Sequence, residues 1–503
     1  MDYKKLQNGS DVRGVAMEGV EGQSVNLTEA AVRDIAAAFT VYLTKRLGKK
    51  ELRLAVGRDP RLSGEALLDA AADSMLQMGA DVTDLGLAST PSMFMCTVTD
   101  GYLYDGAVML TASHLPWNRN GMKFLTRDGG LEKADIAEIL DIAGRGGFAP
   151  AAKRGFLDRT DFLSVYAGGL VESIRAGVNA ADYARPLAGF HIVVDAGNGA
   201  GGFYVDKVLR PLGADVRGSQ FLEPDGHFPN HAPNPEDKTA MDALQACVRQ
   251  NGADLGVLFD TDVDRAGAVS PDGTELNRNR LIALIAATVL EEHPGTTIVT
   301  DSITSSGLSA FIAEKGGVHH RFKRGYRNVI NESMRLNREG TDSQLAIETS
   351  GHGALKENYF LDDGAYLVTK LIIKMAKLRA EGRTLLSLID TLSEPKESTE
   401  VRMDLHTDDF AAYGNGILND LRGYCTAQGW QPAKENYEGM RVSFPAGEGD
   451  GWFLLRMSLH DPLMPLNIES DSTGGVKIIA DKLYRFLKAY DKLDTVKLEK
   501  LTK

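Results

Sequence analysis

The chain is poor in cysteine, with three among 503 residues. Cys96, Cys247 and Cys425 are odd in number, far apart and without a C-x-x-C pair. This spacing excludes a disulfide scaffold and a cysteine-based structural zinc site. It favours a reducing compartment.

Excess positive charge and long apolar runs are also missing. Lys plus Arg number 56 against 69 Asp plus Glu, which gives a net charge of −13. Such an acidic body argues against nucleic acid and anionic membranes as main partners. The longest apolar run, residues 281–290, is too short to span a bilayer. No apolar leader follows Met1, so we expect a cytoplasmic protein.

Three segments share one local plan, in which a β-branched run leads into a polar turn and then a helix start. The runs are residues 52–59, 192–195 and 297–301. Short apolar runs of this kind are typical of strands covered on both faces. The length and the repeated plan predict an α/β protein with three similar mixed α/β domains.

The C-terminal part alternates strand-like runs at residues 401–405 and 452–459 with a helix-like run at 474–490, which predicts a smaller α+β domain that ends in a charged tail over residues 492–503. Turn-rich or polar stretches at residues 144–155, 271–273 and 393–398 mark candidate boundaries. The expected domains are 1–150, 151–273, 274–395 and 396–503.

The first informative loop spans residues 111–123 and presents Ser113 beside His114 before returning with Lys123. Ser113 is a candidate nucleophile, provided that a base or a preorganised field activates it. An ordinary polar hairpin loop is an equally open interpretation.

The second loop carries Asp260, Asp262 and Asp264 at alternate positions, followed by Arg265. Carboxylates packed a few ångström apart repel by about 4 kcal/mol per pair at intermediate dielectric. A hard divalent cation relieves this repulsion, and oxygen ligands suit Mg²⁺ or Ca²⁺. An EF-hand is excluded because Arg265 and Pro271 occupy its Gly and Glu positions. A solvated acidic turn is the alternative.

A third loop contains Glu348, Ser350 and His352 after an apolar run. Its carboxylate and hydroxyl could grip sugar hydroxyls, and His352 could act as a base or a phosphate donor. A histidine satisfied within a turn explains the same pattern.

Two further positions are candidate anion contacts. Arg456 and Ser458 stand two residues apart at a strand end, where both could reach one phosphate. Arg13 lies in a glycine-flanked loop near the start of the chain. Taken alone, each is equally typical of a solvated surface residue.

Together and in this order, these loops resemble those of the α-D-phosphohexomutase family. The serine loop T-A-S-H-x-P-x-x-x-N-G-x-K is met at 111–123, the metal loop D-x-D-x-D-R at 260–265, and the sugar loop E-x-S-G-H at 348–352. The resemblance implies four domains in a heart-shaped arrangement, each of which contributes one loop to a central active-site cleft.

It also implies a phosphotransferase that interconverts hexose 1-phosphate and hexose 6-phosphate, with glucose or mannose as the sugar. Ser113 then carries a phosphate, and Mg²⁺ is held by Asp260, Asp262, Asp264 and the phosphorylated Ser113. The reaction passes through a bisphosphorylated sugar, and a hexose 1,6-bisphosphate serves as the activator that primes Ser113.

The remaining roles are likewise implied by the resemblance. Lys123 is the acid/base residue, Arg13 and His114 support the serine loop, Arg265 flanks the metal loop, His352 is an acid/base residue or phosphate contact, and Glu348, Ser350, Arg327, Arg456 and Ser458 bind substrate.

The chain departs from the family pattern in its phosphate loop. Leu459, His460 and Pro465 replace the usual residues there, and Arg327 stands where a lysine is common. These changes leave three other functions open: a phosphoglucosamine mutase, a non-catalytic sugar-phosphate binder and a metal-dependent phosphatase. The preferred sugar and the oligomeric state are open as well.

Overall fold

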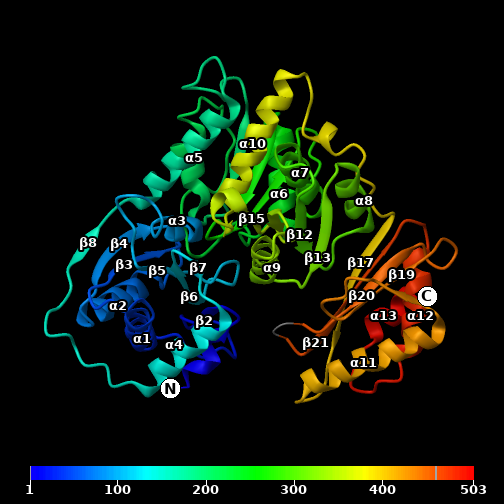
Figure 1. Ribbon diagram of the computed structural model, residues 1–503, viewed down its shortest axis with the longest axis horizontal. Helices are drawn as coiled ribbons and strands as arrows, with labels where there is room; N and C mark the ends of the chain where they lie inside the picture. Colours follow the sequence, from blue (N-terminus) through cyan, green and yellow to red (C-terminus); the bar gives the residue numbers. More distant parts are fainter. Residues whose placement is uncertain (1, 459–460) are drawn as a thin grey trace. The chain divides into compact units, whose positions relative to one another are not determined.

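The computed structural model describes residues 2–458 and 461–503. The chain divides into two compact units (Figure 1). The first extends to Asn277 and resumes over Ser350–Ser387, and the second consists of Arg278–Thr349 and Leu388–Lys503. Among the described residues, no helix combines the length and the apolar character needed to cross a bilayer.

The N-terminal part of the first unit is built on one mixed sheet. Its order is β1 (Gln7–Asn8), β2 (Asp11–Val15), β6 (Arg119–Thr126), β5 (Gly106–Leu110), β3 (Arg53–Arg58), β4 (Asp81–Leu87) and β8 (Leu157–Arg159), with β7 (Gly129–Gly130) on β6. The helices of this part are α1 (Glu29–Leu47), α2 (Gly64–Gln77), α3 (Thr90–Met95) and α4 (Lys133–Arg145).

Helices cover this sheet on both faces, as its apolar strands predict. Leu54 and Val56 of β3 share one core with α1, α2 and α4, which Figure 1 shows beside the strands. The next residue of β3, Gly57, faces α3, where a Cβ atom would lie 2.5 Å from the Met93 sulfur. The small residue therefore allows α3 to approach the strand closely.

A second, three-stranded sheet follows in the first unit. Its order is β11 (Ala266–Val269), β10 (Leu255–Phe259) and β9 (Ile192–Asp195), with β10 parallel to β9 and antiparallel to β11. The other elements of this part are α5 (Phe162–Val178), α6 (Lys238–Asn251), the antiparallel pair β15 (Gly353–Leu355) and β16 (Leu361–Asp362), and α10 (Gly364–Ala380).

The helix start expected after β9 differs from a regular α-helix. The chain forms a 3₁₀ turn at Ala200–Gly202 and a π-helix at Tyr204–Leu209. A Cβ atom on Gly202 would lie 2.3 Å from the Leu222 carbonyl oxygen. Close packing thus requires glycine here, and glycine disfavours a regular helix.

The second unit begins with parallel strands and their helices. Strand β12 (Thr297–Asp301) lies between β13 (Val318–Phe322) and β14 (Ser343–Ile347), and the helices are α7 (Asn279–Glu292), α8 (Ser306–Glu314) and α9 (Tyr326–Arg338). Ser305 caps α8, as its Oγ accepts a hydrogen bond from Leu308 N at 3.0 Å.

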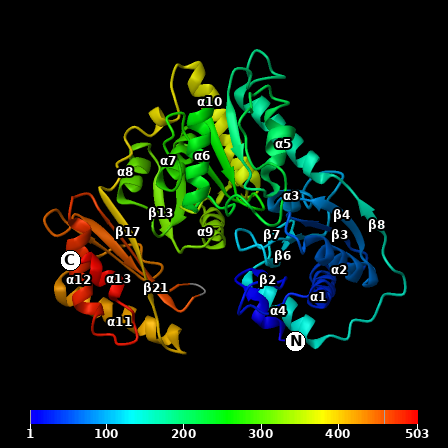
Figure 2. The same ribbon diagram turned by 180° about the vertical axis from the view of Figure 1, so that it is seen from behind.

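The C-terminal part of this unit is an antiparallel sheet covered by helices, which Figure 2 shows from behind. The sheet order is β17 (Glu397–Asp404), β21 (Leu463–Ser470), β20 (Gly451–Leu455), β19 (Met440–Phe444) and β18 (Gln431–Pro432), and the helices are α11 (Phe410–Gln428), α12 (Gly475–Leu487) and α13 (Val496–Leu501).

Two expectations about the C-terminal part need correction. The charged tail contains helix α13, because Leu498 is fully buried against the sheet and anchors that turn. The strand expected over residues 452–459 ends at Leu455.

Pro465 lies within β21, where its carbonyl oxygen accepts a hydrogen bond from Arg456 N at 3.1 Å. The predicted α/β class is confirmed by these layers of strands and helices.

Candidate active site

Ser113 lies in the loop that joins β5 and β6, two antiparallel neighbours. Its side chain is buried, and its φ of 51° is in the left-handed region. Ser113 N donates a hydrogen bond to Thr111 Oγ1 at 2.9 Å. A non-glycine residue in this conformation is strained, and such strain concentrates at functional sites.

The acidic loop and the serine loop meet, although about 150 residues separate them in the sequence. Ser113 Oγ lies 3.4 Å from Asp260 Oδ2 and 3.4 Å from Arg265 Nη2. Arg265 also donates to Asp260 Oδ2 at 3.1 Å and to Asn234 Oδ1 at 3.2 Å. The hydroxyl is therefore held beside both a carboxylate and a guanidinium.

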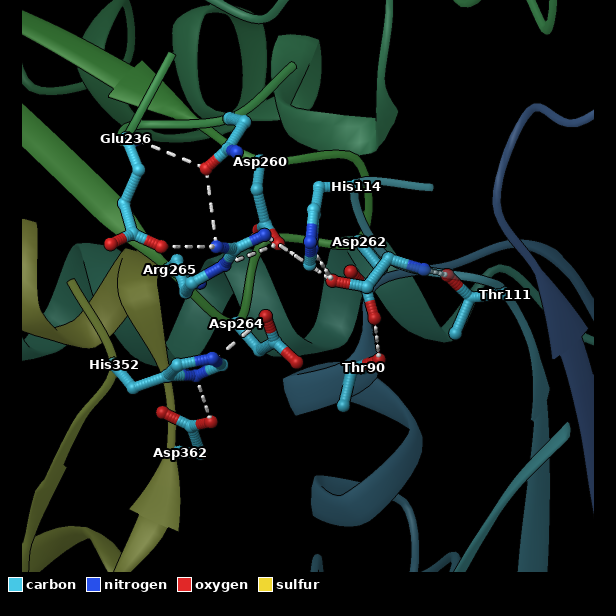
Figure 3. A network of polar contacts seen from close by, with 12 residues as sticks. Thr90, Thr111, His114, Glu236, Asp260, Asp262, Asp264, Arg265, His352 and Asp362 are labelled. Atoms are coloured by element: carbon cyan, nitrogen blue, oxygen red, sulfur yellow. Dashed lines mark hydrogen bonds and ion pairs between the residues drawn. The ribbon is translucent and has the colours of Figure 1, made fainter. Parts of the chain in front are cut away.

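Three buried carboxylates form the centre of the site (Figure 3). Oxygens of Asp260, Asp262 and Asp264 lie within 4.8 Å of one another. In the described part of the chain, Oδ1 of Asp262 and Oδ1 of Asp264 are buried without a hydrogen-bond partner. Burial and the neighbouring Asp264 raise the pKa of Asp260 well above its usual range. Crowded, incompletely paired oxygens of this kind fit a hard divalent cation.

Two residues from the N-terminal part of the first unit also contact these carboxylates. Lys123 Nζ lies 3.1 Å from Asp262 Oδ2 and forms an ion pair with Asp264 as well. Burial raises the pKa of Asp264, but Lys123, His352 and Arg265 together outweigh burial and keep this pKa low. Thr90 Oγ1 donates to Asp262 Oδ2 at 2.5 Å. The sequence reasoning missed Thr90, which begins α3 without any motif.

His352 is paired with a carboxylate that the sequence reasoning also missed. Its Nδ1 lies 2.5 Å from Asp362 Oδ2 and 4.0 Å from Asp264 Oδ1, and Figure 3 shows the ring between the two. Burial lowers the pKa of His352, but the two carboxylates outweigh burial and raise it to about 9. The sequence signal that could have pointed to Asp362 is the run Asp362-Asp363-Gly364 at the start of α10, in which Asp363 is the N-cap.

His114 and Arg13 lie near the serine. His114 Nδ1 is 3.3 Å from Ser113 Oγ. The His114 residue as a whole is exposed, yet protein atoms crowded around its ring, together with Arg265 and Arg13, lower its pKa. Arg13 lies opposite Gly121 in the β2–β6 pairing and donates to Asp11 at 2.9 Å. The lowered pKa of His114 keeps its imidazole neutral at physiological pH.

The other predicted site residues divide between the two units. Ser350 is buried in the first unit, and Glu348 is buried in the second, where its Oε1 accepts a hydrogen bond from Gly325 N at 2.6 Å. Arg327 lies in the first turn of α9. The structure thus places Glu348 and the start of α9 together within the second unit.

Arg456 and Ser458 also belong to the second unit. Arg456 is buried, and within the described residues its Nε has no hydrogen-bond partner. Ser458 Oγ accepts a hydrogen bond from Asp461 N at 3.2 Å. Leu459 and His460, the altered positions of the predicted phosphate loop, lie outside the described residues.

Family models match most of the chain. The models are described as phosphoglucomutase/phosphomannomutase alpha/beta/alpha domains I, II and III, and they match residues 4–149, 169–273 and 277–394.

Several curated proteins are similar over nearly the whole length. A phosphoglucomutase of Neisseria gonorrhoeae is 30% identical over 93% of this chain and 94% of its own. A phosphomannomutase/phosphoglucomutase of Pseudomonas aeruginosa is 30% identical over 92% of this chain and 94% of its own.

A solved structure agrees with these matches. The phosphoglucomutase/phosphomannomutase family protein of Burkholderia thailandensis superimposes with a TM-score of 0.79 at 28% identity, covering 97% of this chain and 98% of that one. The family models, the curated relatives and the solved structure agree. The chain belongs to the phosphoglucomutase/phosphomannomutase family, within the α-D-phosphohexomutases.

Proposed function

We propose that this protein is a phosphohexomutase, an intramolecular phosphotransferase that interconverts hexose 1-phosphate and hexose 6-phosphate, with glucose or mannose as the sugar. The names of its relatives support this activity. The observation that carries the proposal is the meeting of Ser113 with three buried carboxylates, of which Asp260 lies 3.4 Å from the hydroxyl.

Mg²⁺ is the proposed cofactor. The unpartnered carboxylate oxygens of Asp262 and Asp264 and the all-oxygen donor set fit this ion. Asp260, Asp262 and Asp264, together with phosphorylated Ser113, would hold it. When bound, the cation neutralises charge on the phosphoryl oxygens.

The chemistry of the protein's own residues centres on Ser113. The bond between phosphorus and Ser113 Oγ breaks, and a bond forms to the free sugar hydroxyl, whose proton passes to a base. We assign Lys123 as the acid/base residue, with His352 as a second acid/base group or phosphate contact. Arg265, 3.4 Å from the serine oxygen, stabilises the alkoxide as it develops. Neutral His114 and Arg13 support the serine loop.

The bisphosphorylated sugar then turns in the site and returns its other phosphate to Ser113. A hexose 1,6-bisphosphate acts as the activator, because it can phosphorylate a bare serine. We assign sugar and phosphate binding to Glu348, Ser350, Arg327, Arg456 and Ser458.

A domain organisation and a cellular location are also proposed. We propose four domains, residues 1–150, 151–273, 274–395 and 396–503, and the three family matches support the first three. A cytoplasmic location is supported by Cys96, Cys247 and Cys425, which are free, buried thiols.

Intact-mass analysis after incubation with a hexose 1,6-bisphosphate tests the phosphoserine. Wild type should carry one extra phosphate, and Ser113→Ala should carry none. Ser173→Ala is the matched control, because its hydroxyl donates to the Gly169 carbonyl oxygen within helix α5, and it should behave as wild type. Wild type that stays unmodified would contradict the mechanism.

A coupled assay identifies the substrate. Glucose, mannose, glucosamine and N-acetylglucosamine phosphates are compared with Mg²⁺ present, and free inorganic phosphate is measured in parallel. Turnover confined to the amino sugars would favour a phosphoglucosamine mutase, and net phosphate release would favour a phosphatase. No turnover with any of them would favour a non-catalytic binder.

A further inference from the structure

Arg61, between β3 and α2, is fully buried beneath the serine loop. A guanidinium carries five N–H donors. One of them, on Nε, donates to Asp59 Oδ2 at 3.1 Å. The other four go to backbone carbonyl oxygens of the serine loop: Nη1 to Pro116 at 2.8 Å and Arg119 at 3.0 Å, and Nη2 to Leu115 at 2.7 Å and to Ser113.

The guanidinium lies in a crowded part of the fold. The ring of Phe228 lies 5.3 Å from it. A Cβ atom on Gly226 would be 2.8 Å from Arg61 Cα. Without the guanidinium, four carbonyl groups of the loop would lose a donor, and buried unpaired acceptors are costly. The side chain therefore stabilises the shape of the loop.

The geometry points to Arg61 as a positioning residue for the reaction of Ser113. By binding the Ser113 carbonyl it holds the strained φ of 51°, and this conformation keeps Oγ beside Asp260 and Arg265. Within the described residues, Arg61 forms no hydrogen bond to the Ser113 hydroxyl or to Asp260, Asp262 and Asp264, so it acts through the loop. This role rests on the proposed function, in which Ser113 carries the phosphate.

Arg61→Lys tests the role, because lysine keeps the charge beside Asp59 but has one nitrogen and three donors. We expect amide hydrogen exchange over residues 113–121 to accelerate by at least about tenfold, with little change elsewhere in the unit. We expect kcat to fall by about 100-fold, the effect of displacing a reacting group by about 1 Å, with KM changed by less than about threefold.

Arg441→Lys is the matched control. Arg441 is also buried and donates to two backbone carbonyls, Ser302 O at 2.8 Å and Thr304 O at 3.1 Å, in the second unit. This variant should leave exchange over residues 113–121 at the wild-type rate, which separates loss of a buried guanidinium in general from loss of Arg61.

The inference would be overturned if Arg61→Lys showed the wild-type rate of amide hydrogen exchange over residues 113–121 together with the wild-type kcat. If that variant does not fold, Asp59→Asn decides, because it weakens the anchor at Asp59 and leaves the four donors to the loop carbonyls in place. Intermediate exchange of the loop supports the role, and wild-type exchange refutes it. Wild type that lacks both mutase turnover and phosphoserine would refute the proposed function, whereas the exchange experiment would still test Arg61.

Discussion

The amine of Lys123, in strand β6, lies 3.1 Å from the carboxylate of Asp262, which belongs to the loop between β10 and β11. The same amine pairs with Asp264. Lys123 and Arg265, which pairs with Asp260, are thus cations set against three buried carboxylates. The Oδ1 atoms of Asp262 and Asp264 remain for a further ligand, within the described residues.

Asp262→Asn should remove the thermal stabilisation by Mg²⁺ along with the activity. Without metal, the variant should melt at or above the wild-type temperature, because one repelling charge is gone. With Mg²⁺ at 100 times its Kd, wild type should gain about 2.7 kcal/mol, and the variant much less. Melting curves in EDTA and in Mg²⁺ measure this. Asp206→Asn, an exposed control, should respond like wild type; an equal gain in Asp262→Asn would contradict the metal assignment.

Val263→Gly should cost less stability than Val257→Gly. Both valines are fully buried, but Val263 has φ 67° in the acidic loop, whereas Val257 lies in strand β10. Left-handed backbone costs a β-branched residue roughly 1–2 kcal/mol, which glycine recovers. Urea unfolding should therefore show the Val263 variant more stable by about that amount. Equal losses would mean that the loop stores no such strain.

Glu469→Gln should make the second unit more stable at alkaline pH. Burial raises the pKa of Glu469 from 4.5 to about 7, although Arg441 and a 3.0 Å hydrogen bond from Trp452 oppose this. Because the folded pKa lies above the unfolded value, the contribution is complete below pH 4.5 and is lost as pH rises through 7. Glutamine keeps the acceptor and does not ionise.

Thermal melts at pH 5, 6.5 and 8 check this prediction. Between pH 5 and 8, wild type should lose on the order of 3 kcal/mol more than Glu469→Gln. Glu448→Gln, which changes an exposed carboxylate in the loop between β19 and β20, should follow wild type. Parallel curves for wild type and Glu469→Gln would contradict the raised pKa.

The first strand of each repeated plan was predictable, because it is a largely buried apolar run. Strands β3, β9 and β12 lie where the repeated plan placed them. The π-helix after β9 was not predictable, since it follows from Gly202 packing against a carbonyl that arrives from later in the chain. Helix α13 was missed because the single buried Leu498 is hidden among charged neighbours.

The candidate site was predictable where residue types cluster in the sequence, as in the acidic loop. Arg61 and Asp362 were beyond reach for another reason. Arg61 binds carbonyl oxygens, which every residue carries, so no pattern marks its partners. Asp362 precedes Asp363, the N-cap of α10, and in the sequence it resembles part of that capping motif. Contacts between residues from distant segments can be identified only once the fold is known.

The first unit is discontinuous, and this has a consequence for synthesis on the ribosome. Ser350–Ser387, with His352 and Asp362, follows a stretch of more than seventy residues that belongs to the other unit. The nascent chain can form the serine hairpin and the acidic loop early, but the imidazole that lies beside Asp264 emerges only afterwards. Release of a chain that stops at residue 277 would leave a half-built centre, without α10 to close it.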